Sequence, residues 1–223
     1  MSIFWRPRGC VLWFDFAELS GDTVYDLSGN NNHGTIYNCE WRRGHLVGSL
    51  YFNGTDAYVE APDSPSLRVS RYVTMCALVK AKGLEDGYRT VVRKGDDYSI
   101  HIRDDRFDVV TRGTGRPVAG YWVSYNFENN KLYFLTAIIN TDDLKIYYYV
   151  NREFIGTRDL PSDYGEIYQS SVPFWIGYPR ADTLYFYGTI HFVRVYNRVL
   201  SEREIRAHAN YLLQKYIAHP PFI

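Results

Sequence analysis

The sequence has little of what would place it in several common classes of protein. It has only three cysteines, Cys10, Cys39 and Cys76, at spacings that fit no zinc knuckle. The odd number leaves at least one thiol free, and the sequence does not decide whether Cys10 and Cys39 form a disulfide. The 25 basic and 25 acidic residues give no net charge, so nothing indicates a nucleic-acid partner. No hydrophobic run approaches the ~20 residues that cross a membrane, so no membrane span is predicted.

A signal peptide is also lacking. The first eight residues, MSIFWRPR, contain no long apolar stretch and no small-residue cleavage site. This predicts synthesis in the cytoplasm and leaves the final location open.

Aromatic residues, by contrast, are abundant. They make up 17% of the chain, and 21 of them are tyrosines. Tyrosine suits the pleated surface of a strand and also supplies contact area with a polar end. We expect most of these rings to pack within sheets and a minority to contact a ligand.

Alternating segments predict an all-β fold. They are separated by turn residues about every ten positions, which is typical of a β-sandwich rather than βαβ units. Asn53-Gly54 predicts a tight hairpin. The last segment begins at Gly188, where the missing side chain lets the backbone pass close to a neighbour. It ends before the capping box Ser201-x-x-Glu204, which predicts the start of a helix.

Two motifs carry a family resemblance. Residues 26–35, DLSGNNNHGT, and 188–205, GTIHFVRVYNRVLSEREI, resemble the opening and terminal signatures of laminin-G-like (LamGL, concanavalin A-like) jelly-roll domains. The resemblance implies a two-sheet antiparallel β-sandwich with a short C-terminal helix. The domain would span residues 9–214, with residues 1–8 as an N-terminal arm and 215–223 as a tail, loose or docked by Phe222.

The two motifs also predict how the fold closes. We expect the strands that begin at Gly9 and Gly188 to lie side by side in one sheet. Alternation and the family register predict a common core: Trp13, Phe52, Val73, Ile146, Tyr148, Ile176, Val193 and Val195. Tyr147 and Tyr149 would then face the other way and be partly exposed.

The resemblance implies a calcium site between the opening loop and an acidic residue on the final strand. The loop keeps Asp26, Asn30 and Asn32, and calcium prefers such oxygen ligands. The final-strand acid is replaced by His191, which is a poor calcium ligand. Two hypotheses remain: a weakly bound calcium ion held by Asp26 and the asparagines, or a metal-free clasp in which His191 bonds to the Asp26 loop.

Candidate ligand contacts are the aromatic and arginine side chains that a sandwich would expose: Trp41, Arg112, Trp122, Tyr147, Tyr149, Tyr178 and Arg180. Sugars stack on such rings and hydrogen-bond at their edges, but protein interfaces use the same residue types. We therefore expect a non-enzymatic recognition module that binds a glycan or a protein surface ligand. The alternative is an assembly protein, such as a virion or coat component, in which the sandwich forms a homo-oligomer.

An enzyme is the third hypothesis, because this scaffold also hosts carbohydrate-active enzymes. Glycoside hydrolysis needs two carboxylates ~5 to 9.5 Å apart, usually from alternate strand positions. The acids at 96–97 and 142–143 are adjacent, as turn residues are. His101, with Tyr98 and Arg103, weakly resembles the catalytic residues of polysaccharide lyases that share this scaffold. We find no nucleophile elbow and no metal-binding histidine pattern, so no catalytic residue is predicted.

Overall fold

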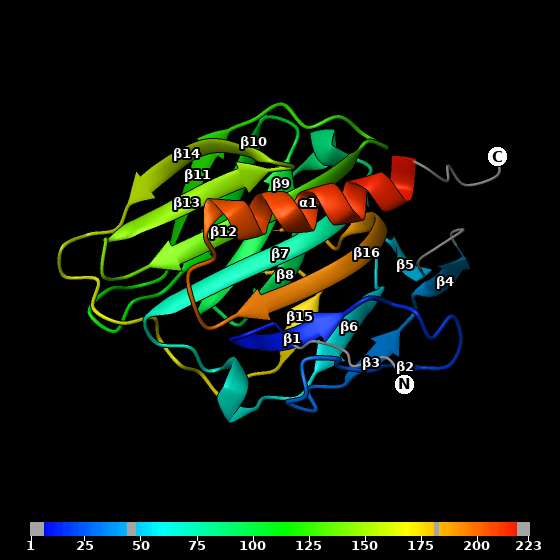
Figure 1. Cartoon of the computed structure of the whole chain (residues 1–223), viewed down its shortest axis with the longest axis horizontal. Helices are drawn as coiled ribbons and strands as arrows, with labels where there is room; N and C mark the ends of the chain where they lie inside the picture. Colours follow the sequence, from blue (N-terminus) through cyan, green and yellow to red (C-terminus); the bar gives the residue numbers. More distant parts are fainter. Residues whose placement is uncertain (1–6, 44–47, 181–182, 218–223) are drawn as a thin grey trace.

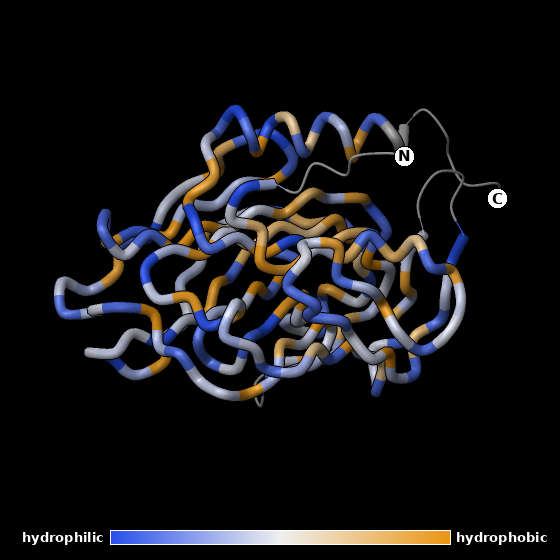
Figure 2. Tube along the Cα trace, turned by 60° about the horizontal axis from the view of Figure 1, so that its bottom comes forward, coloured by the Kyte–Doolittle hydropathy of each residue, from blue (hydrophilic) through white to orange (hydrophobic). Residues whose placement is uncertain are grey.

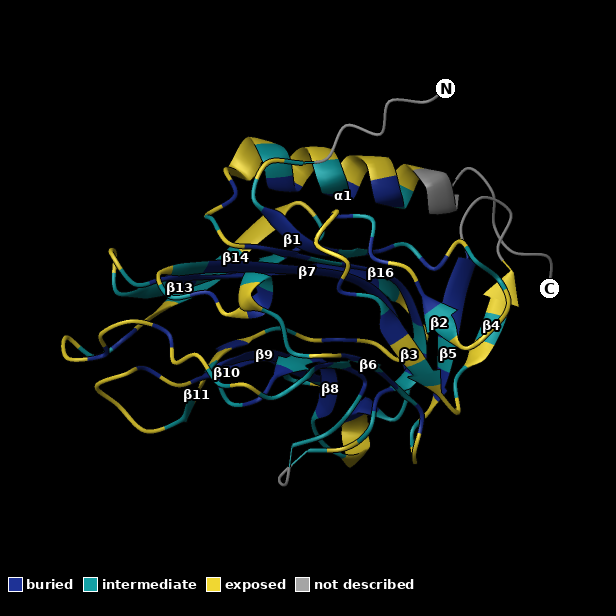
Figure 3. Ribbon diagram, turned by 90° about the horizontal axis from the view of Figure 1, so that it is seen from below, coloured by how far each residue is buried: buried dark blue, intermediate teal, exposed yellow. Residues whose placement is uncertain are grey.

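The computed structural model describes residues 7–43, 48–180 and 183–217. Two antiparallel sheets pack face to face, and one helix lies across the outer face of the first sheet (Figures 1 and 3). The predicted two-sheet β-sandwich with a C-terminal helix is therefore confirmed.

Among the described residues each sheet has eight strands. Sheet A has the order β14-β13-β12-β7-β16-β5-β4, with β1 also paired to β16. Its strands are β1 (Cys10–Phe14), β4 (Glu40–Arg43), β5 (Gly48–Asn53), β7 (Tyr72–Ala81), β12 (Leu132–Asn140), β13 (Lys145–Val150), β14 (Glu153–Asp159) and β16 (Tyr187–Tyr196).

Sheet B has the order β11-β10-β9-β8-β15-β6-β3-β2. Its strands are β2 (Thr23–Val24), β3 (Gly34–Tyr37), β6 (Tyr58–Ala61), β8 (Arg89–Lys94), β9 (Tyr98–Arg103), β10 (Arg106–Thr111), β11 (Ala119–Ser124) and β15 (Phe174–Ile176). The helical segments are two short 3₁₀ turns, η1 (Pro65–Leu67) and η2 (Leu84–Asp86), and the helix α1 (Glu202–Ile217).

The first and last strands lie side by side, as predicted. β1 pairs with β16 in antiparallel register, from Cys10 opposite Tyr196 to Phe14 opposite Val193. Gly188 has φ +131°, and a Cβ there would lie 2.2 Å from the carbonyl oxygen of Lys80 on β7. The close approach therefore needs glycine, which also tolerates this backbone conformation.

The main core lies between the sheets. Seven of the eight predicted core residues are buried there: Phe52, Val73, Ile146, Tyr148, Ile176, Val193 and Val195. The prediction for Trp13 was wrong, because its neighbours Leu12 and Phe14 point inward and Trp13 points outward. Trp13 is half-buried on the outer face of sheet A, with the Arg194 guanidinium 3.8 Å from its ring centroid.

A second, smaller core lies between sheet A and α1. Ile205, Ala209 and Leu212 pack there against outward-facing residues of the sheet, including Phe134 and Phe192. The hydrophobic positions are concentrated in the interior of the trace, and α1 carries both polar and apolar positions (Figure 2). This face of sheet A is thus covered where the helix lies.

The predicted capping box begins the helix. The Ser201 backbone N–H donates to Glu204 Oε2 at 2.9 Å, and the Glu204 N–H donates to Ser201 Oγ at 3.3 Å. The helix continues to Ile217, past the predicted domain boundary at 214. Residues 1–6 of the predicted arm and 218–223 of the predicted tail, with Phe222, lie outside the described residues.

Cys10, Cys39 and Cys76 are all free thiols, so no bridge joins Cys10 to Cys39. Burial raises the pKa of Cys10 to about 12 and that of Cys76 to about 12, which keeps both thiols protonated. None of the described helices combines the length and apolar character that crossing a membrane requires.

Candidate functional site

Aromatic side chains gather on the outer face of sheet B, where β3, β6 and β15 lie together. On β6 and β15, Val59, Phe174 and Ile176 point into the core, so Tyr58 and Trp175 point outward. Tyr37 on β3 lies opposite Tyr58, and the loop after β15 adds two more rings. We call this set the aromatic surface; it consists of Tyr37, Tyr58, Trp175, Tyr178 and Tyr185.

The rings of the aromatic surface contact one another in a continuous row. Tyr37 stacks on Tyr58 with centroids 4.5 Å apart, and Tyr178 meets Tyr58 edge-on at 4.9 Å. Tyr178 also stacks on Trp175 at 5.5 Å and meets Tyr185 edge-on at 5.6 Å. Tyr37 is 39% exposed and the other four rings are half-buried. Because each ring is held by the next, the row presents a fixed platform.

Polar groups lie at the edges of this platform. Glu60 Oε2 accepts a hydrogen bond from Trp175 Nε1 at 2.7 Å. The Arg93 guanidinium lies 5.4 Å from the Trp175 ring centroid and donates to the Pro179 carbonyl at 2.6 Å. Burial, with nearby tyrosines and Glu60, raises the pKa of Tyr58, so its hydroxyl stays neutral and can both donate and accept. Rings edged by hydroxyls and a carboxylate can bind the apolar face of a sugar or a protein surface.

Two of the predicted ligand residues lie at or beside the aromatic surface. Tyr178 is at its centre, in contact with three other rings. Arg180 follows two residues later, and its Nε donates to Asp96 Oδ1 at 3.0 Å. The other five predicted residues are elsewhere on the molecule.

Trp41 and Arg112 are held by local contacts. Trp41 on β4 donates from Nε1 to the Gly21 carbonyl at 2.8 Å and packs against the main core. The Arg112 guanidinium lies 3.9 Å from the ring centroid of Tyr168. Neither contact brings these side chains to Tyr178.

Trp122 lies at the other end of sheet B, on β11. Its ring is 40% exposed, with the Arg106 and Arg158 guanidinium groups 4.4 and 5.6 Å from its centroid. It is a separate exposed ring beside two cations.

Tyr147 and Tyr149 are on the other sheet. Both point to the outer face of sheet A and are half-buried, as predicted, and both pack against the second core below α1. The Tyr147 hydroxyl donates to Asp143 Oδ2 at 2.9 Å, and the Tyr149 ring lies 5.4 Å from that of Phe154. Their contacts are those of packing residues.

Four rings of the aromatic surface were missed: Tyr37, Tyr58, Trp175 and Tyr185. Alternation could have found three of them, because Ile36, Val59 and Ile176 each mark the inward position beside an outward ring. What alternation does not reveal is that β3, β6 and β15 are neighbours. That order follows from the sheet topology alone.

The opening loop is held by hydrogen bonds to the Asp26 carboxylate. Oδ1 accepts from the backbone N–H groups of Trp13 and Ser28, both at 2.9 Å. Oδ2 accepts from Ser28 Oγ at 2.7 Å and from the Asn32 N–H at 3.0 Å. The side-chain amides of Asn30 and Asn32 donate to carbonyls of β1.

This arrangement does not fit a calcium site. Four donors point at a carboxylate that would have to face the cation, and calcium needs oxygen ligands that are free to coordinate. No cluster of His, Cys, Asp or Glu in the described parts of the chain could hold a metal ion. The geometry favours the metal-free clasp. The prediction that His191 forms the clasp was wrong: the Asp26 N–H donates to His33 Nδ1 at 3.0 Å, and His191 is buried on β16 near Lys80.

The histidine considered for catalysis is buried. His101 is 0% exposed, its Nδ1 lies 3.1 Å from Thr90 Oγ1, and its Nε2 lies 2.8 Å from Ser99 Oγ. Burial lowers its pKa to about 3, so the ring is neutral. Tyr98 is also fully buried, and its hydroxyl donates to the Leu67 carbonyl at 2.8 Å. A substrate cannot reach these groups in this conformation.

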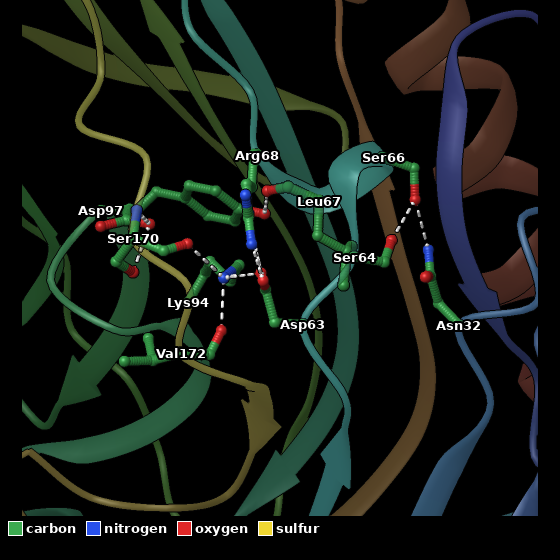
Figure 4. Close-up of polar contacts among 11 residues, drawn as sticks. Asn32, Asp63, Ser64, Ser66, Leu67, Arg68, Lys94, Asp97, Ser170 and Val172 are labelled. Carbon is green, nitrogen blue, oxygen red and sulfur yellow. Dashed lines mark hydrogen bonds and ion pairs between the residues drawn. The ribbon is translucent and has the colours of Figure 1, made fainter.

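A buried lysine forms a separate ionic network (Figure 4). Lys94 is 0% exposed, and its Nζ donates to Asp63 Oδ1 at 2.7 Å and to the carbonyls of Ser170 and Val172. The hydrogen bond from Arg68, reinforced by Lys94, holds the pKa of Asp63 at about 2. Since the ammonium has an acceptor for each of its three protons, it ties two loops together and has no proton left to donate to a ligand.

Comparison with known proteins places this geometry in a family. The model of the concanavalin A-like lectin/glucanases superfamily matches residues 53–206. A comparison with curated proteins found no match. Solved structures with the same fold include the binding domain of Paraclostridial Mosquitocidal Protein 1, with a TM-score of 0.72 and 16% identity over 92% of this chain.

Two further structures are botulinum neurotoxin domains. The binding domain of neurotoxin DC in complex with rat synaptotagmin II has a TM-score of 0.73 and 12% identity over 92% of this chain. The ligand-binding domain of serotype D in complex with N-acetylneuraminic acid has a TM-score of 0.72 and 13% identity over 91%. This chain spans about half of each of these structures, from 51% to 52% of their length. At such low identity the likeness shows the fold alone. The family model, which matches most of the sandwich, shows that the chain belongs to the concanavalin A-like lectin/glucanases superfamily, in its laminin-G-like group.

Proposed function

We propose that this chain is a non-enzymatic recognition module that binds a glycan through the aromatic surface. The observation that carries the proposal is the continuous row of rings on the outer face of sheet B, with Glu60 and tyrosine hydroxyls at its edges. The stacked row is already ordered before a ligand arrives, so binding costs little side-chain entropy. A sugar uses both parts of such a surface, because its C–H face stacks on a ring and its hydroxyls bond at the edge.

Similar folds in known binding domains support this role. One such structure contains N-acetylneuraminic acid and another contains synaptotagmin II. A glycan suits the aromatic surface better than a protein does, because Tyr37 is the one exposed ring among the five and the others are half-buried. A stable protein interface usually buries ~800 Å² on each partner.

The test is a glycan array followed by titration of the strongest neutral oligosaccharide. Tyr37→Ala and Tyr178→Ala should each weaken binding about tenfold or more, equivalent to about 1.4 kcal/mol. The control is Tyr211→Ala, which removes a 58% exposed ring from α1 and should leave the affinity unchanged. Absence of glycan binding, or equal affinity in all variants, contradicts the proposal.

The alternative function is self-association, in which the aromatic surface would contact a second copy of the chain instead of a glycan. Light scattering of the purified protein separates the two functions. A defined oligomer that Tyr37→Ala converts to monomer would indicate the assembly role, whereas a monomer that binds glycan supports recognition.

A further inference from the structure

A pocket opens on the outer face of sheet A, beyond the part that α1 covers. Its volume is about 330 Å³. Tyr51 on β5, Thr189 on β16 and Lys80 on β7 stand side by side in register and form its floor. Figure 1 shows β5 and β4 at the end of the sheet toward which the helix runs. We call this feature the basic pocket; it is lined by Arg42, Tyr51, Lys80, Lys82, Asn130 and Thr189.

The basic pocket has an excess of positive charge. Three of its lining residues are cations and none is an acid. Arg42 pairs with Glu40 at 2.5 Å, on an exposed part of β4. Within the described residues, neither Lys80 nor Lys82 pairs with a carboxylate. Three cations and one neighbouring acid therefore leave about two positive charges unneutralised at the pocket.

His191 adds no charge to this site. It is buried on β16 near Lys80, and burial, followed by the field of Lys80, lowers its pKa to about 3. At neutral pH the ring is uncharged. The pocket therefore stays basic through its lysines and arginine, and histidine protonation does not control it near neutrality.

Two of the three cations, Arg42 and Lys82, lie over aromatic rings. The Arg42 guanidinium lies 4.9 Å from the Tyr51 ring centroid, and Lys82 Nζ lies 5.6 Å from the same centroid and 5.4 Å from that of Tyr187. Such contacts restrain long side chains before a ligand binds. Burial and hydrogen bonding to Tyr187 raise the pKa of Tyr51, so its hydroxyl stays neutral. Uncharged donors next to the lysines complete a set suited to an oxyanion.

We propose that the basic pocket binds the oxyanion group of a ligand about the size of one sugar ring, the group being a phosphate, sulfate or carboxylate. Two lysines, an arginine, two hydroxyl-bearing side chains and an amide line it. Its volume lies at the small end of the ~300–1,000 Å³ range of ligand pockets, enough for a monosaccharide and more than a bare ion needs. The basic pocket is on sheet A and the aromatic surface is on sheet B, so the experiments on the two sites give independent results.

The test is a titration of the ¹⁵N-labelled protein with glucose 6-phosphate, glucose 6-sulfate, glucuronic acid, glucose and inorganic phosphate. At least one acidic sugar should bind about tenfold or more tightly than glucose and more tightly than phosphate alone. The amide shifts should centre on Lys80 and Thr189. Binding should weaken as salt is raised, because the charges are partly exposed. The three acidic sugars identify which oxyanion is preferred.

The matched variants are Lys80→Gln with Lys82→Gln, and Lys145→Gln as control. Lys145 lies on β13 of the same sheet and pairs with Asp159, away from the pocket. The double variant should lose about tenfold or more in affinity, with an unchanged melting temperature, and the control should bind as the unaltered protein does. Lys82→Gln alone serves if the double variant does not fold.

Three outcomes overturn the proposal. The first is equal affinity for glucose and all the acidic sugars. The second is undiminished binding by the double variant. The third is inorganic phosphate binding as tightly as the acidic sugars, which would show that only the ion is recognised.

Discussion

The Asp26 clasp gives the sharpest prediction about stability. In Asp26→Asn the side chain keeps one acceptor oxygen and gains an NH₂ group. Whichever way the amide turns, that group faces at least one backbone donor: the N–H groups of Trp13 and Ser28, or the N–H group of Asn32 beside the Ser28 hydroxyl. The substitution therefore removes two hydrogen bonds to a charged acceptor and places an NH₂ group against at least one backbone N–H.

The cost follows from the number of bonds lost. A hydrogen bond to a charged group contributes about 1.5–3 kcal/mol, and Asp26 is only 7% exposed, so water cannot replace the lost acceptor. We expect Asp26→Asn to lower the free energy of unfolding by about 3–5 kcal/mol. In a domain of this size that corresponds to a melting temperature lower by about 10 °C. Asp26→Ala, which removes all four bonds, should cost at least as much.

Urea unfolding and thermal melts measure this cost, each with chelator and with millimolar calcium. The unaltered protein should melt at the same temperature in both, because donors already occupy the carboxylate. Asp22→Asn is the control, since within the described residues the exposed Asp22 carboxylate accepts from Thr23 Oγ1 alone, and this change should shift stability by less than about 0.5 kcal/mol. A large fall in melting temperature on chelation would show a strong ion site and refute this reasoning. An Asp26→Asn variant as stable as the control would refute the clasp.

Three further predictions concern two buried side chains and one half-buried ring. Lys94→Met should lower the free energy of unfolding in urea by about 3–5 kcal/mol, because the carbonyls and the Asp63 carboxylate lose the ammonium that they bind. A loss below about 1 kcal/mol would show that the network is dispensable. Tyr149→Ala should lower the melting temperature and leave glycan affinity unchanged, since the ring packs below α1; the reverse result would make it a ligand contact. His101 has a folded-state pKa lowered to about 3 by burial, whereas an unfolded histidine titrates near 6.5. The unfolded chain thus binds an extra proton between these pH values. The free energy of unfolding, measured in urea at each pH, should therefore fall as pH drops from about 6.5 to 3, by up to ~1.4 kcal/mol per pH unit. In His101→Gln the contribution of this histidine to the pH dependence should be absent.

Much of the fold is determined by local sequence. The capping box of Ser201 and Glu204 satisfies its own backbone donors within one turn, so it can be identified without any tertiary contact. Period-two alternation placed Ile146 and Tyr148 in the core and Tyr147 on the other face, because side chains of a regular strand alternate strictly. It failed at Trp13, where β1 has a register irregularity between Cys10 and Leu12.

The binding surfaces are decided by tertiary structure. Alternation shows that Tyr58 and Trp175 point outward, but their contact through Tyr178 requires β6 to lie beside β15, and these strands are far apart in the sequence. The basic pocket likewise depends on β5, β16 and β7 being neighbours, which sets Tyr51, Thr189 and Lys80 in one row. Strand order is set by how the whole chain buries its apolar faces, and no local segment contains that information. Within regular strands the sequence by itself therefore determined which residues face outward, with Trp13 beside the irregularity of β1 as an exception, and only the packing of the two sheets decided which of them meet.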